Sequence, residues 1–158
     1  GCQMVSKLKD IIPGAQYWPS FEKNLSDQFE ARLAQVKVKK SDSVLLDGME
    51  GWSMPIASAH GEGYVKFSSN SLDQLISNNQ IALNFVNSKQ ENTETYPLNP
   101  NGSIDGVTGI TAAQGRVTIM MPHPERVFRK LQMSWKPNHW KEFSPWMQIF
   151  INARKFLD

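Results

Sequence analysis

A long alternation of apolar and polar side chains runs from Phe29 to Val38, and it constrains the fold more than any other feature of the sequence. Residues two apart along an extended chain point to the same side, so this stretch predicts a strand with one buried face. Leu33, Val36 and Val38 are the side chains that we expect to point inward. The domain should therefore contain a sheet that is covered on at least one side.

Other stretches predict short helices and strands on both sides of this one. Helical spacing of apolar residues, with serine or proline near the ends of the run, predicts helices at 5–12, 71–77 and 144–156. Short apolar runs predict strands at 43–46, 54–59, 63–67, 81–86, 110–113 and 116–121. The last two strands flank Gln114-Gly115 and are expected to form a hairpin. Strands and helices that mix without a strict alternation indicate an α/β or α+β domain.

The last of the predicted helices carries the clearest apolar stripe. Ser144 is its expected cap, and Pro145 suits the first helical position because its missing N–H needs no partner there. We expect the helix to pack on the rest of the domain through one face, formed by Trp146, Ile149, Phe150, Ala153 and Leu157.

Composition indicates one domain whose main partner is neither nucleic acid nor a membrane. The chain has 158 residues and a net charge of +2, which suits a single domain over residues 1–158 and is too small for a nucleic-acid binder. No apolar run approaches the ~18 residues of a membrane span, and the first residues lack the regions of a signal peptide. The single cysteine excludes an intrachain disulfide and fits a reducing compartment, so the expected location is the cytoplasm.

A histidine and a carboxylate follow the last predicted strand, in the sequence TIMMPHPER. A side chain at the end of a strand faces the edge of the sheet, where clefts form. His123 and Glu125 are two residues apart, so the carboxylate can hold one ring nitrogen while the other stays free as a base. Pro124 stiffens the pair because its φ is fixed. An exposed histidine beside a solvated glutamate is the alternative, and these residues alone do not decide between the two.

Cys2 supplies the third part of a thiol-based acyl-transfer site, because histidine and carboxylate could activate its thiol. Its position as the only cysteine does not establish that it reacts. A zinc site is not expected, because the three histidines, at 60, 123 and 139, show none of the usual ligand spacings.

Two further stretches each have a functional and a structural interpretation. Gly61 and Gly63 allow the backbone to approach a ligand closely, or they form a plain hairpin turn. Residues 129–143 interleave basic side chains with Trp135 and Trp140, a pattern that can bind single-stranded nucleic acid. The small net charge favours the structural interpretation, in which the tryptophans pack on a neighbouring surface.

Several stretches occur in an order that is similar to one known family. They are GCQM, the Tyr17-Trp18-Pro19 segment, NLSDQFEAR, MPIASAHGEG, YPLNPNGS, TGIT, GRVTIMMPHPERVFR and SPWMQIFINARK. Together, over residues 1–158, they resemble the C-terminal glutamine amidotransferase domain of formylglycinamide ribonucleotide amidotransferase, also called phosphoribosylformylglycinamidine synthase, in its large single-chain form. MMPHPERVFR and NPNGS are the most specific of these matches.

The resemblance implies a class I glutaminase domain. Such a domain hydrolyses glutamine through a cysteine thioester and passes ammonia to a distant site, where an ATP-dependent ligase converts formylglycinamide ribonucleotide to the amidine in purine biosynthesis. ATP and Mg²⁺ would bind in the synthetase domain, and no cofactor is expected in this one. The implied partners are glutamine and the remainder of the same polypeptide. His123 would be the general base and acid, and Glu125 would orient it.

The position of the nucleophile is implied by the same resemblance. In this family the turn reads Gly-x-Cys-Asn-Gly-Cys-Gln, and its first cysteine reacts. Gly1-Cys2-Gln3 matches only the last three residues, so the expected nucleophile lies two residues before Gly1, and Cys2 is the second choice. A nucleophile elbow also needs a preceding strand, which Cys2 lacks in this sequence. Contacts with bound glutamine are implied for Gln3 and for the backbone near Ala59, His60 and Gly61.

The implied fold is α/β and flavodoxin-like, with a central parallel sheet. Its first strands and the nucleophile strand would lie before Gly1, so residues 1–158 would be the C-terminal part of the glutaminase domain, starting just after the elbow. Such a piece would expose apolar strand edges, and we expect it to belong to a longer polypeptide or to pack on another copy, and to be inactive alone. An independent thiol hydrolase that uses Cys2, or an inactive interaction module, are the other hypotheses.

Overall fold

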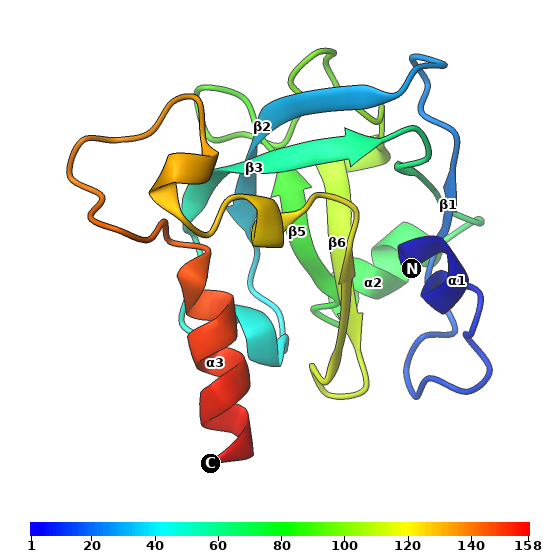
Figure 1. Ribbon diagram of the computed structural model, residues 1–158. Helices are drawn as coiled ribbons and strands as arrows, with labels where there is room; N and C mark the ends of the chain where they lie inside the picture. Colours follow the sequence, from blue (N-terminus) through cyan, green and yellow to red (C-terminus); the bar gives the residue numbers. More distant parts are fainter.

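A curled antiparallel sheet organises the computed structural model, which describes all residues from 1 to 158 (Figure 1). Ten strands and α-helices follow one another along the chain: α1 Cys2–Ser6, β1 Ser20–Glu22, β2 Glu30–Val38, β3 Ser53–His60, β4 Tyr64–Lys66, α2 Ser71–Ser77, β5 Ile81–Phe85, β6 Val107–Ala112, β7 Val117–Met120 and α3 Met147–Leu157. Short 3₁₀ turns occur at Val44–Leu46, Ile104–Gly106, Pro124–Arg126 and Lys130–Gln132.

The main sheet has five strands in the order β3-β2-β5-β6-β7, and β1 pairs separately with β4. Every pair is antiparallel, so the parallel sheet that the resemblance implies does not occur among these residues. The reason is local for β6 and β7, because a tight turn at Ala113, Gln114 and Gly115, all with positive φ, can join only antiparallel neighbours. The hairpin predicted around Gln114-Gly115 is confirmed.

The curl of the sheet brings its two outer strands toward each other. In Figure 1, β2 and β3 cross above β5 and β6 at a steep angle. The chain that leaves β7 then reaches the free edge of β3, where the N–H of His123 donates to the carbonyl oxygen of Ala57 at 2.7 Å. One isolated antiparallel bridge therefore joins the opposite ends of a five-stranded sheet.

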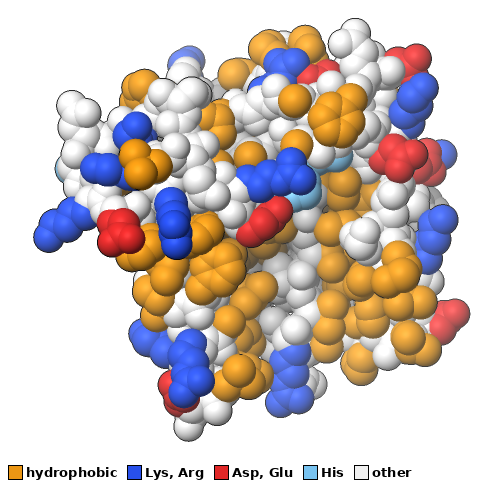
Figure 2. All heavy atoms as spheres, in the orientation of Figure 1, with side chains coloured by type: hydrophobic (Ala, Val, Ile, Leu, Met, Phe, Trp, Pro, Cys, Tyr) orange, Lys and Arg blue, Asp and Glu red, His pale blue; other side chains and the backbone are white.

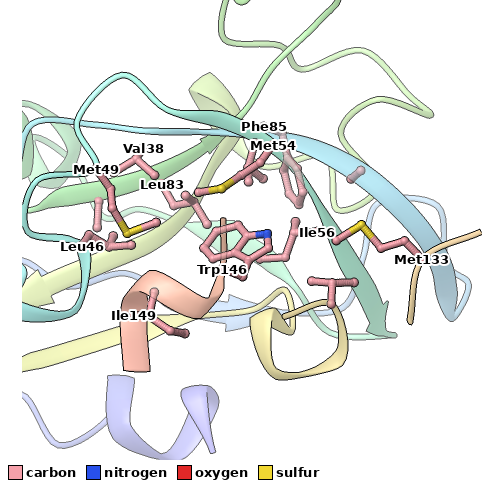
Figure 3. Packing of buried hydrophobic residues seen from close by; sticks show 14 residues of the cluster. Val38, Leu46, Met49, Met54, Ile56, Leu83, Phe85, Met133, Trp146 and Ile149 are labelled. Atoms are coloured by element: carbon pink, nitrogen blue, oxygen red, sulfur yellow. The ribbon is translucent and has the colours of Figure 1, made fainter. Parts of the chain in front are cut away.

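Two apolar clusters cover the two faces of the sheet. The larger lies on the α3 side, where Trp146 is fully buried and its Nε1 donates to the carbonyl oxygen of Pro55 at 2.7 Å. Figure 3 shows the indole ring of Trp146 between Met54, Ile56 and Leu83. The smaller cluster lies on the α1 and α2 side and centres on Trp18. All residues of β5 and β6 are buried, because both faces of these central strands are covered.

The strand predicted from the alternation at 29–38 is confirmed as β2, but one of its three inward residues is wrong. Val36 and Val38 are buried together with Ala34, whereas Leu33 is 36% exposed. Residues 33 and 36 are separated by an odd number of positions and so lie on opposite faces of a strand. The strands at 54–59, 63–67 and 81–86, and the helix at 71–77, are also confirmed, as β3, β4, β5 and α2.

Two predicted elements are wrong. The helix expected at 5–12 is replaced by α1 at Cys2–Ser6, followed by turns through residues 7–14. The strand expected at 43–46 is a 3₁₀ turn, because the hairpin between β6 and β7 rests on it: Val44 donates its N–H to the carbonyl oxygen of Gly115 at 3.0 Å. Apolar runs this short carry too little periodicity to separate a turn from a strand.

The turn after β3 and the start of the last helix also differ from expectation. The strands on either side of HGEG do not pair with each other, since β4 pairs with β1, so a plain hairpin turn is wrong. Helix α3 begins at Met147, and Ser144 accepts a hydrogen bond from the N–H of Trp146 at 3.2 Å. The apolar face predicted for this helix is buried near its start, at Trp146 and Ile149, but not at its end, where Leu157 is 78% exposed.

None of the helices combines the length and the apolar character that a membrane crossing requires. No cluster of histidine, cysteine and acidic side chains has a geometry that could hold a metal ion.

Replacement of Trp146 by alanine should destabilise the domain by about 3–5 kcal/mol, because it removes the largest side chain of the main cluster and leaves a cavity. Ile151→Ala, on the exposed side of the same helix, is the matched control and should cost less than about 1 kcal/mol. Urea unfolding followed by tryptophan fluorescence and circular dichroism measures both. Equal losses in the two variants would contradict the packing described here.

Candidate active site

An open cleft of about 600 Å³ lies where the end of β7, the start of α1 and the end of β3 come together. Figure 2 shows the hollow between two apolar regions of the surface, with a histidine side chain visible at its upper end beside acidic and basic groups. Cys2, Gln3, His60, His123 and Glu125 all line this cleft. Five of the residues singled out in the sequence, at 2, 3, 60, 123 and 125, thus lie around one space.

The histidine and carboxylate that follow β7 form the contact predicted for them. Nδ1 of His123 lies 2.8 Å from Oε1 of Glu125, and Nε2 of the same ring makes no hydrogen bond in the structure. The His123 side chain is 29% exposed, so it is reachable from the cleft. Arg126 approaches the same carboxylate oxygen, with its Nε at 3.7 Å. A carboxylate on Nδ1 directs the lone pair of the ring to Nε2, as a general base requires.

His60, the last residue of β3, occupies the wall of the cleft beside His123. The centroids of the two rings are 6.3 Å apart and the ring planes are inclined by 39°. His60 is only 8% exposed, and its Nε2 lies 2.8 Å from Oδ1 of Asn101 and 3.3 Å from Oγ of Ser58. Burial lowers the pKa of His60, while the hydrogen bond to Asn101 opposes that shift. His60 is therefore a neutral ring at neutral pH.

The thiol of Cys2 bonds to the backbone and to neither histidine. It donates to the carbonyl oxygen of Met120 at 2.9 Å, at the end of β7. Burial raises the pKa of the Cys2 thiol, and the bond to Met120 offsets this only in part. An attacking cysteine needs the opposite shift, toward the thiolate, so the surroundings of Cys2 are those of a structural thiol.

Gln3 and the turn after β3 contact each other across the cleft. Nε2 of Gln3 donates to Oε2 of Glu62 at 2.7 Å and to the carbonyl oxygen of Phe21 at 3.5 Å. These contacts occupy the amide nitrogen and leave the amide oxygen without a protein donor. Ala59 and Gly61, the other two residues implied for glutamine binding, do not line the cleft.

Comparison with known proteins identifies the family. The sequence profile of the CobB/CobQ-like glutamine amidotransferase domain matches residues 1–157. The chain belongs to this family. The resemblance to a glutamine amidotransferase domain is therefore confirmed, and the cleft with its histidine and carboxylate lies in an amidotransferase domain.

A solved structure confirms the fold class. The chain is similar to a chain in the structure of PurLQS from Thermotoga maritima, with a TM-score of 0.69 and 20% sequence identity. The match covers 100% of this chain and 59% of the other, so the chain spans about three fifths of the length of the one it matches. The mixed α/β fold of a class I glutamine amidotransferase is therefore shared between the two.

Sequence reasoning missed the asparagines that hold the turn of the amidotransferase domain at residues 60–63. Asn24 donates from Nδ2 to the carbonyl oxygen of His60 at 2.8 Å and accepts from the N–H of Gly63 at 2.8 Å. Asn101 holds the ring of His60, as described above. Both belong to motifs that carry the family resemblance, NLSDQFEAR and NPNGS, but their partners are distant in the sequence, so no local pattern reveals the contacts.

Cys2 should react slowly with iodoacetamide near pH 7.5, because a raised pKa leaves less thiolate than in an ordinary free cysteine. The rate should rise as the pH is raised toward the pKa of the thiol. Peptide mapping by mass spectrometry after timed alkylation measures it, with glutathione in the same tube as the reference thiol. Alkylation of Cys2 faster than that of glutathione would contradict a structural role.

Proposed function

We propose that these residues form part of the glutaminase unit of a phosphoribosylformylglycinamidine synthase. The unit hydrolyses glutamine and supplies ammonia to a ligase that forms a C–N bond in purine biosynthesis. The observation that carries the proposal is the contact of His123 Nδ1 with Glu125 Oε1 at 2.8 Å, in the cleft of an amidotransferase-family domain. The MMPHPERVFR motif, which includes both residues, supports this particular amidotransferase.

The proposed chemistry uses both ring nitrogens of His123. A cysteine thiol gives its proton to Nε2, and the sulfur attacks the carboxamide carbon of glutamine. The C–N bond then breaks, the proton passes from His123 to the leaving nitrogen, and ammonia departs from a glutamyl thioester. Water, deprotonated by the same histidine, hydrolyses the thioester to glutamate and restores the thiol. Glu125 holds Nδ1 throughout and stabilises the imidazolium that forms between these steps.

The proposed nucleophile is a cysteine two residues before Gly1, and Cys2 is not the reacting group. The match of Gly1-Cys2-Gln3 to the end of the family turn supports this position. The bond from the Cys2 thiol to Met120 and its raised pKa argue against an independent thiol hydrolase that uses Cys2. Without that nucleophile, residues 1–158 alone should release no glutamate from glutamine.

We further propose that the remainder of the same polypeptide completes the domain beside β7. The outer edge of β7 has no partner strand, and its residues Thr118–Met120 line the open cleft. Unpaired edges next to an apolar cleft suit the addition of further strands. The synthetase domain would bind ATP and Mg²⁺, glutamine would enter the cleft lined by Gln3 and His60, and the protein would act in the cytoplasm.

In the complete enzyme, His123→Ala should lower glutamine-dependent turnover by about 10²- to 10⁴-fold, because it removes the general base. Ammonia-dependent turnover, which bypasses glutamine hydrolysis, should stay at the wild-type rate. Glu125→Gln should give the same selectivity with a smaller loss, because it removes only the group that orients the ring. Steady-state assays with each nitrogen source measure this. Equal loss with glutamine and ammonia would mean that His123 is structural.

Cys2→Ser in the complete enzyme should keep glutamine-dependent activity within about threefold of wild type, because the thiol only donates to a backbone carbonyl that a hydroxyl can also reach. Serine at the proposed nucleophile, two residues before Gly1, is the matched variant and should abolish glutamate release. Trapping of a glutamyl thioester by acid quench and mass spectrometry distinguishes the two positions. A thioester on Cys2 would overturn the assignment.

A further inference from the structure

The ring of His60 is placed beside the general base by the same strand that holds the base in position. The carbonyl oxygen of Ala57 in β3 accepts a hydrogen bond from the N–H of His123 at 2.7 Å. Three residues later the strand ends at His60, whose ring lies 6.3 Å from the ring of His123. A displacement of His60 would therefore change the surface of the cleft next to the imidazole of His123.

The surroundings of His60 fix one orientation and one tautomer of its ring. Oδ1 of Asn101 is an acceptor, so Nε2 of His60 carries the proton and donates it at 2.8 Å. The other nitrogen, Nδ1, is buried without a hydrogen-bond partner. Asn101 is itself completely buried, and its backbone N–H donates to Oδ1 of Asn99 at 3.2 Å, which anchors the main chain of the acceptor.

A glycine makes room for this pair. A Cβ atom at Gly63 would lie 2.5 Å from Nε2 of His60 and 2.6 Å from Nδ2 of Asn101. Both distances are below ordinary contact, and both atoms belong to buried side chains. The HGEG turn therefore needs Gly63 for a reason beyond chain reversal, because any side chain there would displace the ring of His60.

The two neighbouring histidines have opposite electrostatic surroundings. His123 has the carboxylate of Glu125 2.8 Å from its Nδ1. His60 has a neutral amide, and burial lowers its pKa. The hydrogen bond to Asn101 opposes this shift, the charge of His123 adds to it, and the backbone of Met121 and the charge of Glu30 oppose it. When the surroundings of two neighbouring titratable groups differ in this way, only one of them takes up the proton during the reaction, so the two groups have different roles.

We propose that His60 is a positioning residue for His123: Asn101 fixes its neutral tautomer, and its ring forms the rigid wall that keeps the imidazole of His123 aligned with the nucleophile and the substrate amide. The proposal rests on the glutaminase function given above. It differs from the glutamine contact expected for His60, because the ring acts on the base and not on the substrate. Misplacement of a catalytic group by about 1 Å can cost on the order of 10²-fold in rate, so a loss of this size is expected when the wall is removed.

The test compares His60→Leu with His60→Gln in the complete enzyme. Leucine fills a similar volume without a polar atom, and it should lower glutamine-dependent kcat by about 10- to 100-fold while KM stays within about twofold. Ammonia-dependent turnover should not change. Glutamine at this position is neutral and keeps a polar group for Asn101, so it should restore most of kcat. The acid limb of the pH profile of kcat/KM should stay where it is in the wild type.

Gly63→Ala provides an independent variant that leaves His60 in the chain. The added Cβ should displace the ring and lower kcat by a similar factor, again without a change in KM. An increase in KM alone, in any of these variants, would make His60 a substrate contact and overturn the proposal. A shift of the acid limb in His60→Gln would make His60 a proton-transfer group, which also overturns it.

His123→Ala, assayed in parallel, distinguishes a failure of the positioning role from a failure of the proposed function. If His123→Ala selectively abolishes glutamine-dependent turnover while His60→Leu and Gly63→Ala behave as wild type, only the positioning role is wrong. If His123→Ala has no selective effect, the proposed function itself fails. Loss of both glutamine- and ammonia-dependent turnover in His60→Leu and Gly63→Ala would show a role in folding alone and would overturn the positioning role.

Discussion

One backbone hydrogen bond, from the N–H of His123 to the carbonyl oxygen of Ala57, joins the two ends of the curled sheet. Strands β3 and β7 are the outer strands of a five-stranded sheet, so a flat arrangement would place them farthest apart. The twist and curl of antiparallel strands bring the end of β7 back to the free edge of β3. The cleft forms at this junction, with His123 and Glu125 on the β7 side and His60 on the β3 side.

The hydrogen bond that joins the two ends of the sheet explains how short elements can form an ordered site. His123 lies in a short segment between β7 and a 3₁₀ turn, yet its backbone is anchored to β3 and its ring is held by Glu125. Beside His123, the ring of His60 is held by Asn101, and the main chain of the turn that follows β3 is held by Asn24. Hydrogen bonds of the buried amide side chains of Asn24 and Asn101 thus hold this part of the site in place of regular secondary structure.

The elements that the sequence predicts well are those with a strong local pattern. The alternation at 29–38 became β2, and the apolar runs on either side of Gln114-Gly115 became the hairpin of β6 and β7. The helix at 5–12 and the strand at 43–46 were wrong because apolar runs this short carry little periodicity, and at 43–46 a distant contact also decides the conformation. Val44, for example, is held by the carbonyl oxygen of Gly115, seventy-one positions away.

The spacing of His123 and Glu125 in the sequence predicted that the two side chains could meet, and the structure confirms the contact. The family motifs likewise settled the class of protein. Only the tertiary structure decided that Cys2 bonds a backbone carbonyl and that His60 is buried and neutral. The physical reason is that burial and its effect on pKa depend on the atoms that surround a group, and these come from segments as distant as β3 and the NPNGS loop.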